Sequence, residues 1–153
     1  MTVSAAALLD GAKAPLLEAT VSLHVPFYDC DPAGIVWHGN YAKYFDQARC
    51  ALLGQIDYGY VRMAESGYTW PLIDFWARHV KPLHFGQQAN VRAWLCEWEF
   101  RLKVAYLITD AASGARLCKG HTVQVAVRID NGEMQVGSPP VLRQRLRERL
   151  GAV

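Results

Sequence analysis

The sequence predicts a single α+β domain in which one long helix follows a first strand and precedes a run of antiparallel strands. Three observations support this prediction. Apolar and polar residues alternate before residue 28, the apolar spacing becomes helical from Asn40, and the alternation returns after Gly67. A parallel βαβ fold would instead place a helix between successive strands, and the second half of the chain lacks that order.

The amino-acid composition argues against a disordered chain, a nucleic-acid-binding protein and an integral membrane protein. The chain has 153 residues, 52% of them hydrophobic and 20% charged, which excludes a disordered chain. A net charge of +2 does not predict a nucleic-acid partner, and no apolar run reaches the roughly 18 residues of an integral membrane helix. The Val3–Leu9 run follows no Lys or Arg, and the four cysteines are scattered without a CxxC pair. We therefore expect a cytoplasmic protein without a structural metal.

The first part of the chain predicts an arm, a strand and then the helix. Residues 1–17 are Ala-rich and aperiodic, which indicates a loose N-terminal arm. The alternation of Leu23, Val25 and Phe27 predicts a first strand, in which Pro26 fits only at an edge or an end. Asn40 is the expected N-cap of the long helix, and Gly54 marks its end. The helix presents one apolar stripe, formed by Tyr41, Phe45, Ala48 and Leu52.

The rest of the chain predicts a short helix, four strands and a basic tail. The short helix covers Tyr60–Glu65, and the tail at 141–153 places leucines at helical spacing among arginines. Those arginines fit a solvated face, a phosphate site or a helix lying on a partner or membrane surface. Turns are expected at Ser113-Gly114 and Asn131-Gly132. The predicted strands are Trp70–Val80, Gln88–Phe100, Leu102–Ile108 and Val123–Ile129.

The connection between the first strand and the helix, YDCDPAGIVWHGNY, is the candidate site. It places Asp31 beside the start of the helix, where unpaired N–H groups and a partial positive charge can stabilise an oxyanion. An aspartate is ionised at neutral pH, so Asp31 can attack a carbonyl carbon or deprotonate a water molecule. A thiol has a pKa of about 8.5 and leaves without a strong general acid, whereas an amide nitrogen needs one. These residues therefore favour thioester hydrolysis over peptide hydrolysis.

Other readings of the same residues stay open. Asp and Gly before a helix also serve as ordinary turn and capping residues. Asp29 fits a structural role better than a catalytic one, through bonds to the local backbone. His38 fits a general base, a metal ligand or a hydrogen-bonding residue at the helix start, and we favour the last because no partner follows it at metal-ligand spacing.

The motifs in this stretch resemble a known family. DCDPAGIVW resembles the signature of the 4-hydroxybenzoyl-CoA thioesterases, within the hotdog-fold acyl-CoA thioesterases. HGNYAKYFDQAR is similar to the HxNYxxxFxxAR continuation of related bacterial short-chain and aryl acyl-CoA thioesterases, and VKPLHFG is similar to a later family segment. The resemblance covers most of residues 19–140, so we expect residues 18–140 to form the hotdog domain.

The resemblance implies roles for individual residues. It makes Asp31 the nucleophile or general base and places the backbone N–H of His38 on the thioester carbonyl. Gly34 would allow close backbone approach, and Trp37, Asn40 and Tyr41 would shape the substrate pocket. The basic candidates for the coenzyme A phosphates are Arg78, Lys81 and Arg128.

The resemblance also implies partners and alternatives. We expect an enzyme without a cofactor that hydrolyses an aryl or short-to-medium acyl thioester of coenzyme A, or of acyl carrier protein. We further expect a homodimer with active sites at the subunit interface, and a homotetramer as a dimer of dimers. The alternatives are a hotdog acyl-CoA dehydratase or hydratase that uses His38, a non-catalytic acyl-CoA binding protein and, least favoured, a metallohydrolase.

Overall fold

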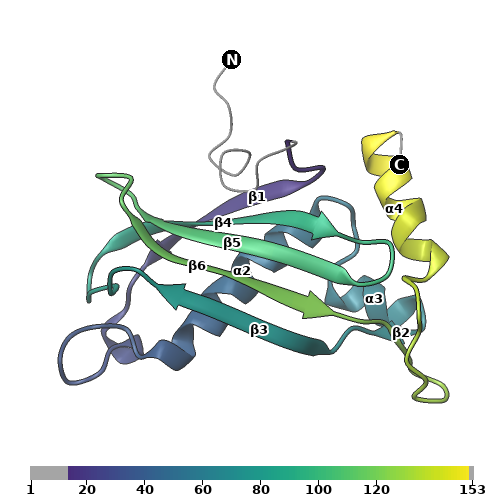
Figure 1. Cartoon of the computed structure of the whole chain (residues 1–153), viewed down its shortest axis with the longest axis horizontal. Coiled ribbons are helices and arrows are strands. Elements are labelled where there is room, and N and C mark those ends of the chain that lie inside the picture. Colours follow the sequence, from purple (N-terminus) through teal and green to yellow (C-terminus); the bar gives the residue numbers. More distant parts are fainter. Residues whose placement is uncertain (1–13, 152–153) are drawn as a thin grey trace.

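One antiparallel sheet and one long helix dominate the computed structural model, which describes residues 14–151 (Figure 1). Most of the expected N-terminal arm, residues 1–13, lies outside the described residues. The sheet has five strands in the order β1-β4-β5-β6-β3, and helix α2 (Tyr41–Gly54) lies across one of its faces. The strand bounds are β1 Glu18–His24, β3 Leu72–His79, β4 Gln88–Glu97, β5 Leu102–Asp110 and β6 Arg116–Gln124.

The apolar stripe of α2 faces the sheet, as its spacing predicts. Tyr41, Phe45, Ala48 and Leu52 are all buried. The Phe45 ring stacks on Tyr106 of β5, with centroids 4.3 Å apart, and it also contacts Phe75 of β3. The Phe45 ring therefore reaches β5 and β3, while the backbone of α2 lies nearest β1 and β4, and these contacts together fix where the first turn of the helix lies.

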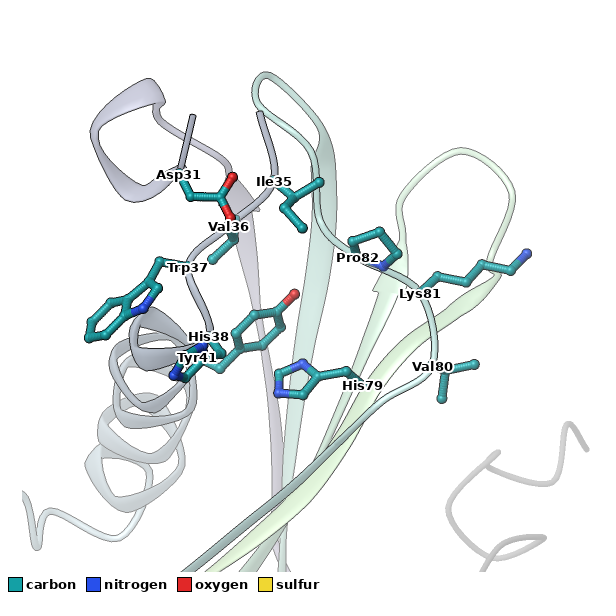
Figure 2. A pocket seen from close by; sticks show the side chains of 10 residues that line it. All are labelled: Asp31, Ile35, Val36, Trp37, His38, Tyr41, His79, Val80, Lys81 and Pro82. Carbon is teal, nitrogen blue, oxygen red and sulfur yellow. The ribbon is translucent and has the colours of Figure 1, made fainter. Parts of the chain in front are cut away.

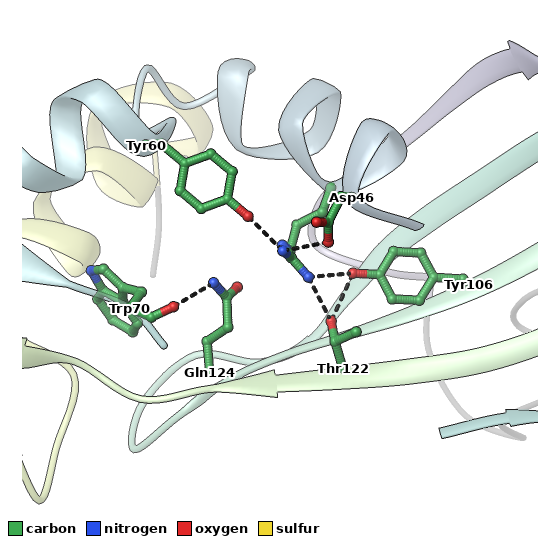
Figure 3. A network of polar contacts seen from close by, with 7 residues as sticks. Asp46, Tyr60, Trp70, Tyr106, Thr122 and Gln124 are labelled. Atoms are coloured by element: carbon green, nitrogen blue, oxygen red, sulfur yellow. Dashed lines mark hydrogen bonds and ion pairs between the residues drawn. The ribbon is translucent and has the colours of Figure 1, made fainter. Parts of the chain in front are cut away.

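A buried arginine adds a polar connection between α2 and the sheet (Figure 3). Arg49 donates to Tyr106 on β5 and Thr122 on β6, at 3.3 and 3.2 Å, and to Tyr60 at 2.5 Å. It also forms an ion pair with Asp46 one turn earlier, at 2.7 Å. This side chain joins the helix, two strands and helix α3 (Tyr60–Glu65), so their relative positions are specified by hydrogen bonds as well as by packing.

One predicted strand is wrong. The residues Val123–Ile129 do not form one strand, because the chain leaves the large sheet after Gln124 and the Val125 N–H donates to the Pro71 carbonyl. A separate strand, β7 (Val127–Arg128), then pairs with β2 (Tyr68–Thr69). The strand in the large sheet begins earlier, at Arg116. The predicted turns at Ser113-Gly114 and Asn131-Gly132 are present, and the second leads to a single bridge between Val127 and Met134.

The first strand ends before Phe27, contrary to the alternation pattern. Phe27–Asp29 form a 3-10 turn, η1, and the Phe27 ring is 71% exposed. The turn arises because the N–H groups of Asp29 and Cys30 donate to the carbonyls of Pro26 and Phe27. Pro26 follows the edge strand β1, as expected for proline.

The C-terminal helix α4 (Pro140–Leu150) packs on the body of the protein. Leu142 and Leu146 are fully buried and belong to the main core, so its apolar face is not available to a membrane surface. Arg143 lies over the Trp98 ring, and Arg145 pairs with Asp57. Within residues 14–151, no helix has the length and apolar character needed to cross a membrane. An antiparallel sheet packed around a central helix is the hotdog architecture that the resemblance implies.

Candidate active site

Asp29 anchors the loop that connects β1 to α2. Its side chain is buried, with one carboxylate oxygen accepting from Lys43 Nζ and the other from Tyr44 Oη, each at 2.6 Å. Burial by itself raises the pKa of the Asp29 carboxyl, but the Lys43 and Tyr44 hydrogen bonds and the Lys43 charge lower it below its ordinary value. Asp29 is therefore a structural anion. Its side chain bonds to α2, whereas we expected it to bond to the local backbone.

The backbone of Asp29 holds the far end of the same loop. Its carbonyl accepts from the Trp37 N–H at 2.9 Å and from Asn40 Nδ2 at 2.8 Å. The expectation that Asn40 caps the helix is therefore wrong: its side chain makes no cap hydrogen bond and its backbone is helical. A 3-10 turn, η2 (His38–Asn40), leads directly into α2 instead.

The start of η2 leaves hydrogen-bond donors unused. Within residues 14–151, the N–H groups of His38 and Gly39 donate to no protein acceptor, whereas that of Asn40 donates to the Trp37 carbonyl. The first N–H groups of a helical segment lack intrahelical partners, and aligned peptide dipoles add a partial positive charge there. These two N–H groups can therefore bind a carbonyl oxygen that is gaining negative charge.

Asp31 is held in a tight turn on the same loop. Its Oδ1 accepts from the Ala33 N–H at 2.9 Å, which is an Asx turn. Its backbone N–H donates to the Ile35 carbonyl, and its carbonyl accepts from Gly34, whose φ of +81° suits glycine. No protein donor within the described residues reaches Oδ2 of Asp31. One carboxylate oxygen is thus fixed by the turn while the other is available for chemistry.

A cavity of about 370 Å³ brings the loop and the end of β3 together (Figure 2). Its volume is within the range of small-molecule sites. The charged or titratable residues on its wall are Asp31, Lys81, His38, His79 and Tyr41, and the remaining lining residues are apolar. The ten residues that line the cavity are Asp31, Ile35, Val36, Trp37, His38, Tyr41, His79, Val80, Lys81 and Pro82.

Tyr41 and His79 form one side of the cavity. Their rings meet edge to face, with centroids 4.4 Å apart, and Figure 2 shows both side chains directed into the space. The Leu83 N–H donates to the Tyr41 hydroxyl at 3.3 Å. Burial is the main cause that raises the pKa of the Tyr41 phenol above its ordinary value, so this group stays protonated.

The structure separates the remaining site candidates. Gly34 and Asn40 support the loop without lining the cavity. Trp37 lines the cavity, and its ring centroid lies 5.1 Å from that of His38. Of the basic candidates, Lys81 lies on the cavity wall. Arg78 and Arg128 do not: Arg78 lies over the Trp76 ring, and Arg128 pairs with Asp130 on the strand β7.

Sequence reasoning missed His79, Val80 and Pro82 as site residues. They enter the site because the β3–β4 connection packs on the loop: the Val36 N–H donates to the Leu83 carbonyl, and the Phe85 N–H donates to the Gly34 carbonyl. The segment VKPLHFG carried this signal in part, since it follows His79 directly. Within residues 14–151, no three His, Cys, Asp or Glu side chains are arranged to hold a metal ion.

A family model describes most of this chain. Residues 25–149 match the model of the thioesterase-like superfamily, and they include the loop, the helix and every residue that lines the cavity. The chain belongs to this superfamily. Among its relatives, YneP of Bacillus subtilis, which carries the name of an acyl-CoA thioesterase, is 31% identical over 59% of this chain. The match spans 66% of YneP, slightly less than two thirds of its length.

Solved structures of other proteins share the fold of this chain. A protein from Aquifex aeolicus superposes with a TM-score of 0.75 and 27% identity, over 84% of this chain and 98% of its own. A variant of 4-hydroxybenzoyl-CoA thioesterase, in complex with 4-hydroxybenzoyl-CoA, gives a TM-score of 0.72 at 19% identity, over 84% of this chain and 98% of that one. The hotdog fold of the chain is therefore shown by both comparisons.

Proposed function

We propose that this protein is an acyl-CoA thioesterase, which hydrolyses an acyl thioester to the free acid and coenzyme A. One observation carries the proposal: the Asp31 carboxylate and the unpaired N–H group of His38 border the same, mostly apolar cavity. A thioester needs a nucleophile or a base, a site for its oxyanion and a dry pocket for its acyl group. Asp31 and the His38 N–H are candidates for the first two, and the apolar wall of the cavity suits the acyl group.

The reaction uses the chain's own groups. The thioester carbonyl oxygen accepts from the N–H groups of His38 and Gly39, and Oδ2 of Asp31 faces the carbonyl carbon. Asp31 either attacks this carbon, forming an anhydride that water then hydrolyses, or takes a proton from the attacking water. In both routes the C–S bond breaks and the thiolate leaves, because a thiol with a pKa of about 8.5 is a good leaving group.

The relatives support this choice of substrate class. YneP carries the name of an acyl-CoA thioesterase, and the structural neighbour described above holds an acyl-CoA. The ring-lined wall formed by Trp37, Tyr41 and His79 suits an aryl or a short acyl group. Acyl carrier protein thioesters present the same reacting atoms and are a close variant of this proposal.

A homodimer is part of the proposal. The cavity is open, and Trp37 and Val80 on its wall remain more than half exposed in the single chain. Exposed apolar groups of this size beside an open cavity favour a partner surface. A second copy of the chain would cover them and close the acyl pocket, and a dimer of dimers is the expected larger assembly.

Replacing Asp31 with Asn tests the chemistry. The Asp31→Asn variant keeps the Asx turn but removes the charge, so kcat on a panel of aryl, short and long acyl-CoAs should fall by roughly 10²–10⁴-fold. Asp130→Asn is the matched control, because Asp130 is exposed and pairs with Arg128 away from the cavity. Near-full activity of the Asp31 variant, or wild-type activity only on enoyl or 3-hydroxyacyl thioesters, would refute the assignment.

A further inference from the structure

The outer face of the sheet carries a second cavity that the reaction does not use. It has a volume of about 450 Å³ and lies on the face turned away from α2, which Figure 1 presents to the viewer. Phe75 and Gly120 meet Phe45 of α2, so their strand neighbours Trp76 and His121 point to the opposite face. We call this cavity the outer cup; the side chains that define it are Trp76, His121, Lys103 and Lys119.

The outer cup pairs flat rings with positive charge. Trp76 and His121 are register partners whose rings stack with centroids 5.5 Å apart, and Trp76 is 40% exposed. Arg78, two residues after Trp76, lies opposite Lys119 in the strand register, with its guanidinium 5.6 Å from the Trp76 ring. Rings beside cationic side chains form the usual setting for a nucleotide, whose base stacks while its phosphates pair with the cations.

The lysines of the cup, and Arg78 beside it, form no ion pairs in the described part of the chain. Lys103, Lys119 and Arg78 take part in no salt bridge within residues 14–151, whereas Arg92 and Arg101 on the neighbouring strands pair with Glu18 and Glu97. Two carboxylates lie near these cations: Asp74 is two residues before Trp76, and Glu97, which pairs with Arg101, lies opposite Lys103 in the strand register. The His121 imidazole reflects this balance: burial lowers its pKa first, the Lys103 and Arg101 charges lower it further, and Asp74 only partly offsets them.

The cup lies close to the candidate active site along β3. Trp76 precedes His79 by three residues, about 10 Å along a strand, and the strand ends at His79, just before Val80 and Lys81. A ligand whose reacting end lies beside Asp31 can therefore pass Lys81 at the end of β3 and reach the outer face. The proposed substrate has this form, since its thioester and its nucleotide are joined by the flexible pantetheine arm.

We propose that the outer cup binds the adenine nucleotide end of coenzyme A. The base packs against the Trp76–His121 pair, and Lys103, Lys119 and Arg78 hold the phosphates. This inference rests on the proposed function for its choice of ligand, but the binding site can be tested without turnover.

The binding test uses adenosine 3′,5′-bisphosphate in calorimetric titrations, with adenosine as the uncharged comparison. Trp76→Ala and Lys119→Met should each weaken bisphosphate binding about tenfold, the size expected for one lost stacking or charged contact. Arg116→Met is the matched control, because it removes one exposed cation from the same strand outside the cup. Equal affinity of all variants, or no binding to the wild type, would overturn the proposal.

The kinetic test compares an acyl-CoA with the same acyl group on pantetheine. We expect the wild type to have a lower KM for the acyl-CoA, and Lys119→Met to raise that KM about tenfold while leaving kcat and the pantetheine reaction unchanged. Equal KM values for both substrates in the wild type would refute nucleotide binding in the outer cup without contradicting the proposed thioesterase activity. Absence of hydrolysis of either would refute the thioesterase.

Discussion

At the scale of single residues, Asp29 shows how one side chain positions another. Its carboxylate is bonded to Lys43 and Tyr44 on α2, and its carbonyl is bonded to Trp37 and Asn40 at the far end of the loop. Asp31 lies in the loop between Asp29 and Trp37, and the N–H group of His38 directly follows Trp37. Asp29 therefore holds the loop that sets the spacing between the Asp31 carboxylate and the proposed oxyanion donor, the His38 N–H.

The Asp29 anchor predicts a pH-dependent loss of stability. The pKa of Asp29 is lowered in the folded state, so its contribution is present above the unfolded-state pKa and is lost as the pH falls through the lower folded-state value. Tyr44→Phe leaves a buried carboxylate oxygen without its donor and should reduce the free energy of unfolding by about 1–3 kcal/mol at pH 7. Urea unfolding from pH 7 to pH 3 measures this difference, which should shrink towards the acid end. A difference that grows in acid would contradict the anchor.

At the scale of elements, the spacing of apolar residues predicts those elements that bury one face against the core. The stripe from Tyr41 to Leu52 and the helix Tyr60–Glu65 follow from spacing alone, because burial against any flat core requires them. The strand Arg116–Gln124 does not follow from residue spacing, because it contains Lys119 and Gly120 and its apolar alternation is broken.

The missed features share a cause in long-range contacts. Val123–Ile129 alternates well but changes sheets at Gln124, whose side chain donates to the Trp70 carbonyl. Asn40 resembles a helix cap in sequence, yet its amide is used by Asp29, eleven residues earlier in the chain. Asp31 could be predicted as a site candidate because its motif is local, whereas His79 lies on a strand that the sequence alone does not place beside the loop.

Close packing between α2 and β6 gives a prediction at the same scale. A Cβ on Gly120 would lie 2.4 Å from the Trp76 carbonyl oxygen and 2.6 Å from the Phe45 ring, which is itself stacked on Tyr106. Gly120→Ala should therefore destabilise the fold by about 1–3 kcal/mol through overpacking. Gly54→Ala is the matched comparison: it lies at the end of α2 with open space around it, and should be neutral or stabilising by up to about 1 kcal/mol. Thermal unfolding of both variants checks the sign, and equal effects would contradict this packing.

At the scale of the whole molecule, the two edges of the sheet differ. The β1 edge is followed by the anchored loop, whereas β3 is an eight-residue edge strand with exposed apolar side chains. An exposed, apolar edge strand is a template for pairing with another chain. Antiparallel pairing of two β3 edges about a two-fold axis would use the same surface in both copies and leave neither β3 edge open. The exposed apolar residues of β3 are Leu72, Ile73, Phe75 and Trp76.

Pairing through β3 predicts that assembly and activity are lost together. Ile73 is 52% exposed on this edge, and Ile73→Glu would place a charge in the apolar pairing surface, so the expected dimer should dissociate at micromolar concentration in sedimentation experiments. Val136→Glu is the control, since Val136 is 87% exposed in the loop before α4. Because β3 ends at His79 on the cavity wall, dissociation should expose the acyl pocket to water and lower kcat/KM in proportion to the monomer fraction. A monomeric Ile73→Glu variant with wild-type kcat/KM would show that each chain carries a complete site.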